Sequence, residues 1–274
     1  MELTASLHSL YVPMEGTFFF RKYPPNVYLI QRDQSVLIDS GYGDEASVNN
    51  RLKQLRTLQD PEISYIILTH PHPDHLGGAE RFKDITGAKV IIHNQDADVA
   101  NEMFEHTKID EAFNDGDIIN IGNDELQLVH TPGHTYGHTC VLRKSDRALF
   151  TGDHILGTGT TAVGTERGDM AKYIESLRKL QGMDIAALYP GHGSPVQEPQ
   201  RKIKELLDHR LERERQIFNN LSEGNNTIKT IVAAIYPELD PDLLTSATGQ
   251  VTVHLIKLEK EGRVKSDGEI YSIK

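Results

Sequence analysis

The chain has 274 residues, of which 38% are hydrophobic and 25% charged, as is ordinary for a soluble globular protein with one large domain or two smaller ones. Its one cysteine, Cys140, excludes a disulfide framework, and no stretch approaches the length of apolar sequence that crosses a bilayer. The first residues, Met1 to Thr4, contain no basic segment followed by an apolar run. We therefore expect no signal peptide, no membrane partner and a cytoplasmic location.

The net charge of −11 is unevenly distributed along the chain. Residues 1–199 contain 17 Lys and Arg against 28 Asp and Glu, which accounts for all of it, whereas residues 200–274 contain 12 of each kind. A polyanionic partner would therefore need a local positive surface, made by metal ions and by cations of the neutral C-terminal part.

Strands and helices alternate in the prediction for residues 1–199. Short apolar runs indicate strands, and apolar residues at helical spacing indicate helices. The predicted strands are 27–30, 36–39, 65–68, 89–93, 118–121, 125–130, 139–143, 148–151 and 187–189. The predicted helices are 45–58, 77–82, 96–104 and 170–180, with an acidic loop at 105–116. This order predicts a layered α/β architecture.

The stretch Thr69-His70-Pro71-His72-Pro73-Asp74-His75 follows one of these strands. Because proline disfavours both regular helix and sheet, we expect an extended loop with His70, His72 and Asp74 on one side and His75 at the following turn. These four side chains would crowd one another without a cation, and imidazole and carboxylate groups suit divalent ions such as zinc. A surface loop that is merely rich in histidine explains the pattern less well. The stretch predicts a metal site.

Three later strand ends repeat this arrangement with a glycine next to a possible ligand. They place His134 after strand 125–130, Asp153 after strand 148–151 and His192 after strand 187–189. Each is weak alone, because a Gly-His pair is more often a turn than a ligand. In combination with the first loop they indicate one metal centre at the carboxyl ends of several strands.

This set of residues resembles the metallo-β-lactamase superfamily, whose fold is an αββα sandwich. The resemblance implies two divalent ions, with zinc expected first and manganese or iron as alternatives. It implies that the first ion is bound by His70, His72 and His134, and the second by Asp74, His75 and His192, with Asp153 bridging the two. Asp39, in Leu37-Ile38-Asp39-Ser40-Gly41, would support the site without being a ligand.

The same resemblance implies the chemistry of a zinc-dependent hydrolase. Two ions roughly 3.5–4 Å apart would hold a bridging hydroxide as the nucleophile, so that no Ser-His-Asp triad is needed. Asp74 and Asp153 are the expected catalytic carboxylates.

Residues 200–274 are predicted to form a second domain, after a hydrolase domain of residues 1–199. A long amphipathic helix is expected at 201–221, further helices at 228–236 and 250–261, a helix start at Asp240-Pro241, and a hairpin turning at Asp267-Gly268. This order resembles a winged helix. Its zero net charge leaves two alternatives open: the domain contacts nucleic acid, or it packs on the hydrolase domain or mediates dimerisation.

Motifs in both domains resemble the β-lactamase-like protein 2 family. They are Gly152-Asp153, Ile155-Leu156-Gly157, Gly159-Thr160-Thr161, Tyr189-Pro190-Gly191-His192-Gly193, His209-Arg210, His254-Leu255 and the run from Lys257 to Gly262. Members of that family are metal-dependent endoribonucleases, so the resemblance implies cleavage of single-stranded RNA. Phosphate contacts are expected from Lys and Arg of the second domain, among them Arg201, Lys202, Lys204 and Arg210.

Two other functions remain open at this point. A glyoxalase II-like thioester hydrolase, or another ester or lactone hydrolase, would use the same ligands, although the C-terminal pattern that binds glutathione is not apparent. A zinc-bound regulator would leave a complete ligand set idle. A monomer and a homodimer are both compatible with the sequence.

Overall fold

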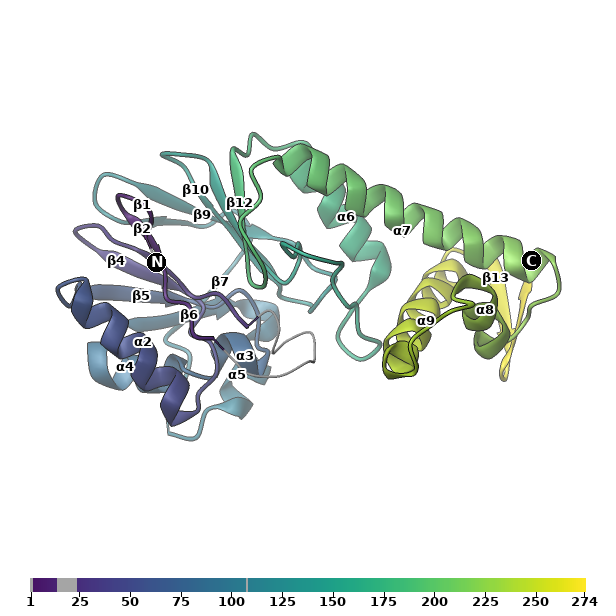
Figure 1. The fold of residues 1–274 in the computed structure, drawn as a ribbon, viewed down its shortest axis with the longest axis horizontal. Coiled ribbons are helices and arrows are strands. Elements are labelled where there is room, and N and C mark those ends of the chain that lie inside the picture. The colour runs from purple at the N-terminus through teal and green to yellow at the C-terminus, as the bar shows by residue number, and fades with distance from the viewer. Residues whose placement is uncertain (1, 14–23, 107) are drawn as a thin grey trace. The chain divides into compact units, whose positions relative to one another are not determined.

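The computed structural model describes residues 2–13, 24–106 and 108–274, which group into two compact units (Figure 1). The first unit consists of Met1–Thr131, Gly137–Thr160 and Asp184–Pro199, and the second of Pro132–Tyr136, Thr161–Met183 and Gln200–Lys274. This division shares the boundary after Pro199 with the predicted domains 1–199 and 200–274. It differs from them in assigning residues 132–136 and 161–183 to the C-terminal unit.

Two β-sheets form the framework of the first unit. The seven-stranded sheet has the order β1-β2-β3-β4-β5-β6-β7, with β1 Glu2–Thr4, β2 Leu7–Ser9, β3 Tyr28–Ile30, β4 Ser35–Ile38, β5 Ile63–Ile67, β6 Lys89–His93 and β7 Glu111–Phe113. The five-stranded sheet has the order β12-β11-β10-β9-β8, with β8 Ile118–Asn120, β9 Glu125–His130, β10 Thr139–Arg143, β11 Ala148–Gly152 and β12 Ala187–Pro190. Strands β1, β2 and β7 were not predicted, and β7 lies within the expected acidic loop.

Alternating side chains of the seven-stranded sheet enter two different cores. Val36 and Ile38 of β4 pack toward the five-stranded sheet, whereas Leu37 between them packs with the helices. The helices on that face are α2 Glu45–Thr57, α4 Ala79–Thr86 and α5 Ala97–Met103, the last preceded by the short turn η1 Asn94–Asp96 (Figure 1). The layered α/β architecture is therefore confirmed.

Parallel pairing brings the ends of several strands to one edge of each sheet. β4 pairs in parallel with β5, and β5 with β6, while β11 pairs in parallel with β12. Asp39 follows the carboxyl end of β4, and His70 follows that of β5. In the other sheet, Asp153 follows β11 and His192 follows β12. The segments that carry the predicted site therefore leave the sheets at strand ends.

The second unit has the helices and hairpin that the sequence predicts for a winged helix. Its elements are α6 Met170–Gln181, α7 Pro199–Ser222, α8 Ile228–Ile235, η2 Pro241–Leu243, α9 Leu244–Lys260, β13 Val264–Asp267 and β14 Ile270–Ile273. Thr227 caps α8 by accepting a hydrogen bond from the backbone N–H of Thr230. Side chains of α7, α8, α9 and β13 share one apolar core, which includes Ile217, Ile231 and Val251. Helix α9 begins at Leu244, earlier than the predicted residue 250.

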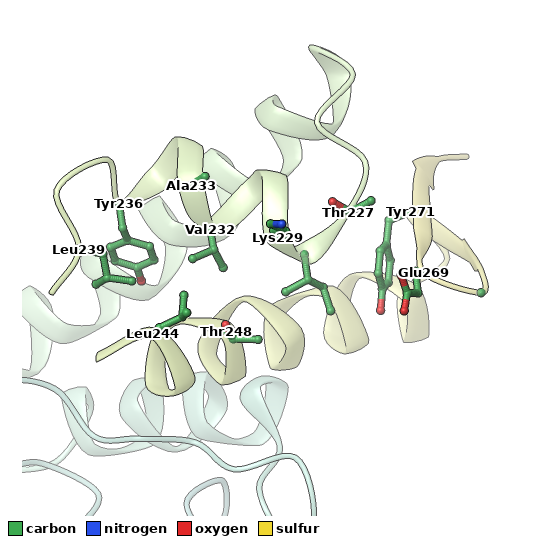
Figure 2. Close-up of a pocket in the computed structure, with 12 residues that line it drawn as sticks. Thr227, Lys229, Val232, Ala233, Tyr236, Leu239, Leu244, Thr248, Glu269 and Tyr271 are labelled. Atoms are coloured by element: carbon green, nitrogen blue, oxygen red, sulfur yellow. The ribbon is translucent and has the colours of Figure 1, made fainter. Parts of the chain in front are cut away.

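A hollow of about 780 Å³ lies within the second unit, between α8, the start of α9 and the turn of the hairpin (Figure 2). Figure 2 shows Val232 and Tyr236 on one side and Leu244 on the other. None of the predicted metal ligands lines it, so the hollow is separate from the predicted site. Across the described ranges, the helices are too short or too polar for any of them to traverse a bilayer.

Candidate metal centre

The histidine-rich stretch leaves β5 and turns at once into a short helix, α3 Pro73–Leu76. The predicted extended loop is therefore wrong for Asp74, which lies in α3, whereas His75 lies at the turn that was expected there. Pro73 occupies the first helical position, where its missing N–H would have no partner in a helix anyway. The backbone N–H of His75 donates to the His72 carbonyl at 2.9 Å, so the turn begins directly behind His72.

Four buried side chains from three segments converge in the first unit. Asp74 and His75 come from α3, Asp153 follows β11 and His192 follows β12. The His192 Nε2 atom lies 3.1 Å from Asp74 Oδ2 and 3.5 Å from Asp153 Oδ1. The His75 Nε2 atom lies 3.4 Å from Asp153 Oδ1 and 3.3 Å from His192 Nε2. Three strand ends far apart in the sequence thus deliver their polar atoms to one place.

Asp39 orients the ring of His75 through a contact with its Nδ1 atom. Its Oδ2 atom lies 2.7 Å from His75 Nδ1, and its Oδ1 atom accepts the Thr69 backbone N–H at 2.8 Å. With Nδ1 engaged, the Nε2 atom of His75 faces Asp153 and His192, as a metal ligand requires. Asp39 has a φ of 60°, a left-handed conformation that Asp tolerates better than most residues.

The carboxylates shift the pKa values of the two histidines. Burial lowers the pKa of His75, but Asp153, Asp39 and Asp74 together raise it well above its usual value. Burial likewise lowers the pKa of His192, and the bond to Asp74 and the charge of Asp153 more than offset this, so the net shift is upward. For Asp74, burial raises the pKa, yet the neighbouring histidines bring it below the ordinary value. The negative charge of the cluster therefore attracts positive charge to this point.

His70 and His72 lie together, with His70 Nε2 2.9 Å from His72 Nδ1. The other ring nitrogen of His70 lies 3.0 Å from the Thr69 hydroxyl, which in turn donates to Asp39. A ligand atom of His70 is also within 4.8 Å of ligand atoms of His75 and Asp153. His134 belongs to the second unit, so its place in the ligand set stays a prediction.

Asn26 is a supporting residue that the sequence analysis missed. Its side-chain amide donates to the carbonyls of Pro190 at 2.9 Å and Gly193 at 2.8 Å, on both sides of His192. Its backbone N–H donates to the Gly191 carbonyl at 2.7 Å. The sequence Pro24-Pro25-Asn26 at the start of a strand was the available signal, because an Asn there can bond to backbone groups of another segment.

Gly191 explains why glycine precedes the last histidine. A Cβ atom there would lie 2.7 Å from both Asp153 Oδ1 and His75 Cε1. Any side chain at position 191 would therefore enter the space where the ligand atoms meet.

The donor set of the first unit fits divalent metal ions. Two groups of three residues, His70 with His75 and Asp153, and Asp74 with His75 and His192, each offer ligand atoms within 4.8 Å of one another. All of them are buried, and imidazole nitrogen with carboxylate oxygen is the donor set of zinc, manganese and iron sites. The other two histidines near the site, His138 and His154, are fully buried, with their rings 5.7 Å apart.

Sequence comparison agrees with this geometry. Residues 21–192 match the family model described as the metallo-beta-lactamase superfamily, and residues 227–272 match the one described as the beta-lactamase associated winged helix domain. The winged helix of the second unit is thereby confirmed.

Individual relatives cover most of the chain. A beta-lactamase-like protein 2 homolog of Drosophila melanogaster is 33% identical over 90% of this chain and 87% of its own. An atrochrysone carboxyl ACP thioesterase of Aspergillus fumigatus is 30% identical over 82% of this chain and 69% of its own. The crystal structure of a metallo-beta-lactamase family protein from Thermus thermophilus superimposes with a TM-score of 0.77 at 23% identity, over the whole of both chains. The chain belongs to the metallo-β-lactamase superfamily and has its αββα fold, extended by a C-terminal winged helix.

Proposed function

We propose that the protein is a hydrolase that depends on two divalent metal ions. The observation that carries this is the convergence of Asp74, His75, Asp153 and His192 on one buried point. His70, His72 and His134 would hold the first ion, Asp74, His75 and His192 the second, and Asp153 both. When bound, the ions would supply an activated water and neutralise the negative charge that develops during hydrolysis.

The residues of the chain have distinct parts in this proposal. Asp39 fixes the ring of His75 through Nδ1, and Asn26 fixes the turn that carries His192. Asp74 and Asp153 keep the site anionic, so that it attracts cations. Zinc is the first choice for both positions, with manganese or iron as alternatives.

As the substrate we propose single-stranded RNA. The support is the resemblance to the β-lactamase-like protein 2 family in both parts of the chain, together with the identity to a relative of that name. A flexible single strand also suits ligands that lie at strand ends in a buried cluster better than a rigid duplex does.

The charges of the second unit give weaker support than the sequence suggested. Arg210, one of the four expected phosphate contacts, is only 1% exposed, so its guanidinium is not available to a phosphate. Lys202 lies 3.4 Å from Glu205, and Lys204 lies 2.5 Å from Asp208. RNA binding would therefore have to rely mainly on the metal ions and on cations outside these pairs.

A thioester hydrolase is the second candidate, and the same charges favour it. A neutral acyl group needs no positive surface, and residues 1–199 carry the whole net charge of −11. A relative at 30% identity is named as a thioesterase acting on an acyl carrier protein. The fold and the metal ligands are common to both candidates.

One set of assays separates these possibilities. Metal analysis of protein purified without chelator should give about two divalent ions per chain. Labelled single-stranded oligoribonucleotide and an acyl thioester are then each incubated with the wild-type protein and with Asp153→Ala. Cleavage of RNA that is lost in Asp153→Ala and weakened by salt supports the first candidate, because phosphate contacts are sensitive to salt. RNA left intact beside rapid thioester hydrolysis favours the second, and a protein that binds no metal after zinc or manganese is added refutes both.

A further inference from the structure

Two side chains of the second unit form hydrogen bonds to residues 161–163 of the same unit. Arg210 of α7 donates through Nη2 to the carbonyl of Thr161, and Gln250 of α9 donates through Nε2 to the carbonyl of Val163 at 3.1 Å. Arg210 Nη1 also donates to Gln250 Oε1 at 3.1 Å. The two side chains are thus linked to each other, and together they hold the carbonyls on both sides of Ala162.

The Ala162 carbonyl between them is the partner of a predicted metal ligand. Its oxygen lies 2.8 Å from His134 Nδ1. A carbonyl can only accept, so the contact assigns the proton to Nδ1 and places the lone pair of the neutral ring on Nε2. In metal sites such a second contact fixes the tautomer and the orientation of the histidine.

The loop that carries His134 is held at further points in the same unit. The Asp169 backbone N–H donates to the Gly133 carbonyl at 2.9 Å, and the Ser176 hydroxyl donates to the Pro132 carbonyl at 2.9 Å. A Cβ atom on Gly133 would lie 2.4 Å from Tyr173 Cα, so only glycine fits against α6 there. Arg210 reaches this side as well, with its guanidinium carbon 5.2 Å from the centre of the Tyr173 ring.

The burial of Arg210 makes it an unusual structural choice. A guanidinium that is 1% exposed loses its hydration, and this costs free energy unless its hydrogen bonds are well placed. Arg213, one turn further along α7, has a comparable set of contacts, but these are with Gln216 and with the ring of Tyr236. The two arginines therefore differ in their partners, because Arg210 donates to the backbone of Thr161 and Arg213 donates to a side chain of its own helix.

We propose that Arg210 and Gln250 are positioning residues for His134. They fix the Ala162 carbonyl, the carbonyl holds the imidazole through Nδ1–H, and the ring would then offer Nε2 to a metal ion. All of these contacts lie within the second unit, so residues of that unit would orient His134 for metal binding. This inference rests on the ligand role of His134 in the proposed function.

The test measures metal affinity in the full-length chain. Metal-free protein is titrated with zinc against a competing chelator, which gives a dissociation constant for each of the two ions. The variants are Gln250→Ala, Arg210→Lys and His134→Ala, with Gln216→Ala and Arg213→Lys as matched controls from the second Arg–Gln pair. Thermal unfolding of each metal-free variant establishes that it folds. If Arg210→Lys does not fold, Gln250→Ala decides, because the Gln250 side chain is partly exposed.

We expect Gln250→Ala and Arg210→Lys to weaken the binding of one zinc ion by roughly tenfold to a hundredfold, as for other residues that orient a ligand. The controls should leave both constants unchanged. In the His134→Ala background, Gln250→Ala should have no further effect, because residues that act through one another are not additive.

Two results would overturn the inference alone: His134→Ala weakens zinc binding while Gln250→Ala behaves like Gln216→Ala, or the effect of Gln250→Ala persists in full without His134. If His134→Ala leaves both zinc constants unchanged, the ligand assignment in the proposed function is wrong and the inference falls with it.

Discussion

Buried charges occur in both units, but they are arranged in opposite ways. In the second unit Glu214 meets Lys257 at 2.5 Å and Arg263 at 2.6 Å, so each charge touches its counterpart directly. In the first unit His192 Nε2 lies 3.1 Å from Asp74 Oδ2, while His75 Nε2 and His192 Nε2 both face Asp153 Oδ1 at the longer separations of 3.4 and 3.5 Å. Directly paired opposite charges stabilise a fold, whereas imidazole and carboxylate groups of several residues that meet at one point can bind a metal ion.

The two arrangements should respond differently to the loss of one member. Removal of a group from the converging cluster should abolish metal binding and activity with little effect on folding. Removal of a group from the closed network should reduce the free energy of unfolding and leave the metal site intact. The four predictions below test this contrast, beginning with the largest expected effect.

Asp153→Ala should lower the hydrolytic rate by roughly a thousandfold or more, because several kcal/mol of charge stabilisation depend on the metals it would hold. Steady-state rates and metal content measure the loss, and circular dichroism establishes that the variant is folded. His154→Ala is the control, since His154 is adjacent in sequence but is not a predicted ligand. Equal losses in the two variants would mean that the wrong residue has been assigned to the metals.

Asp39→Asn should weaken zinc binding by about tenfold to a hundredfold, since Asn can keep the left-handed backbone but no longer accepts at both oxygens. Asp124→Asn is the matched control. Asp124 accepts from the buried guanidinium of Arg143 at 2.7 Å, so its loss should cost about 3 kcal/mol of stability. Zinc titration and chemical unfolding of both variants give the comparison. A similar loss of zinc affinity in both would contradict a specific role for Asp39.

Glu214→Gln should lower the free energy of unfolding by roughly 1–3 kcal/mol, because two cations lose their counter-charge while Glu261 still lies near them. Zinc affinity should not change. Glu212→Gln, which removes a surface pair with Arg215, should cost less than about 1 kcal/mol. A change in zinc affinity for Glu214→Gln would break the contrast between the two networks.

The last prediction concerns acid stability and His254, an effect confined to low pH. Burial, followed by the charges of Arg210, Lys257 and Arg213, lowers the pKa of this fully buried histidine to about 3. The unfolded chain, with a pKa near the ordinary 6.5, therefore binds the proton more readily, and stability falls as the pH drops below about 6.5. Between pH 7 and pH 5 this one group should remove about 2 kcal/mol.

His254→Leu should abolish that contribution, so urea unfolding of the metal-free protein at both pH values measures it as a difference. Parallel pH profiles for wild type and variant would show that His254 does not titrate as its burial requires.

The proximity of Asp153 and His192 was predictable because each follows an apolar run that forms a strand. His192 follows β12, and the parallel pairing of β11 with β12 brings it to Asp153, as the repeated strand-end pattern suggested. The turn of Pro73 into α3 was missed, because a proline that stops a helix in its interior starts one at its first position. The short strands β1, β2 and β7 were missed because they have only three residues each and no long apolar run.

The contacts of Asn26 and Arg210 that support the site could not be predicted from sequence patterns. Asn26 holds the His192 turn across a separation of 164 residues, which no local spacing reveals. Arg210 shows the opposite error, since a basic residue on an amphipathic helix suggested a surface contact and the structure buries it. Burial of a charge depends on partners such as the Thr161 carbonyl, which come from another part of the chain.

The interleaving of the two units along the chain has a consequence for how such a protein can evolve. A winged helix attached only by its first residue could be lost through a premature stop codon, or exchanged between genes, without harm to the remainder. Here Thr161–Met183 lies between two segments of the first unit in sequence, yet its Thr161 and Val163 carbonyls are bonded by residues of α7 and α9. A stop codon near residue 200 would leave those carbonyls, and the Tyr173 ring, without their partners. The C-terminal helices are therefore expected to be inherited together with the hydrolase segment and not to be shuffled as an independent module.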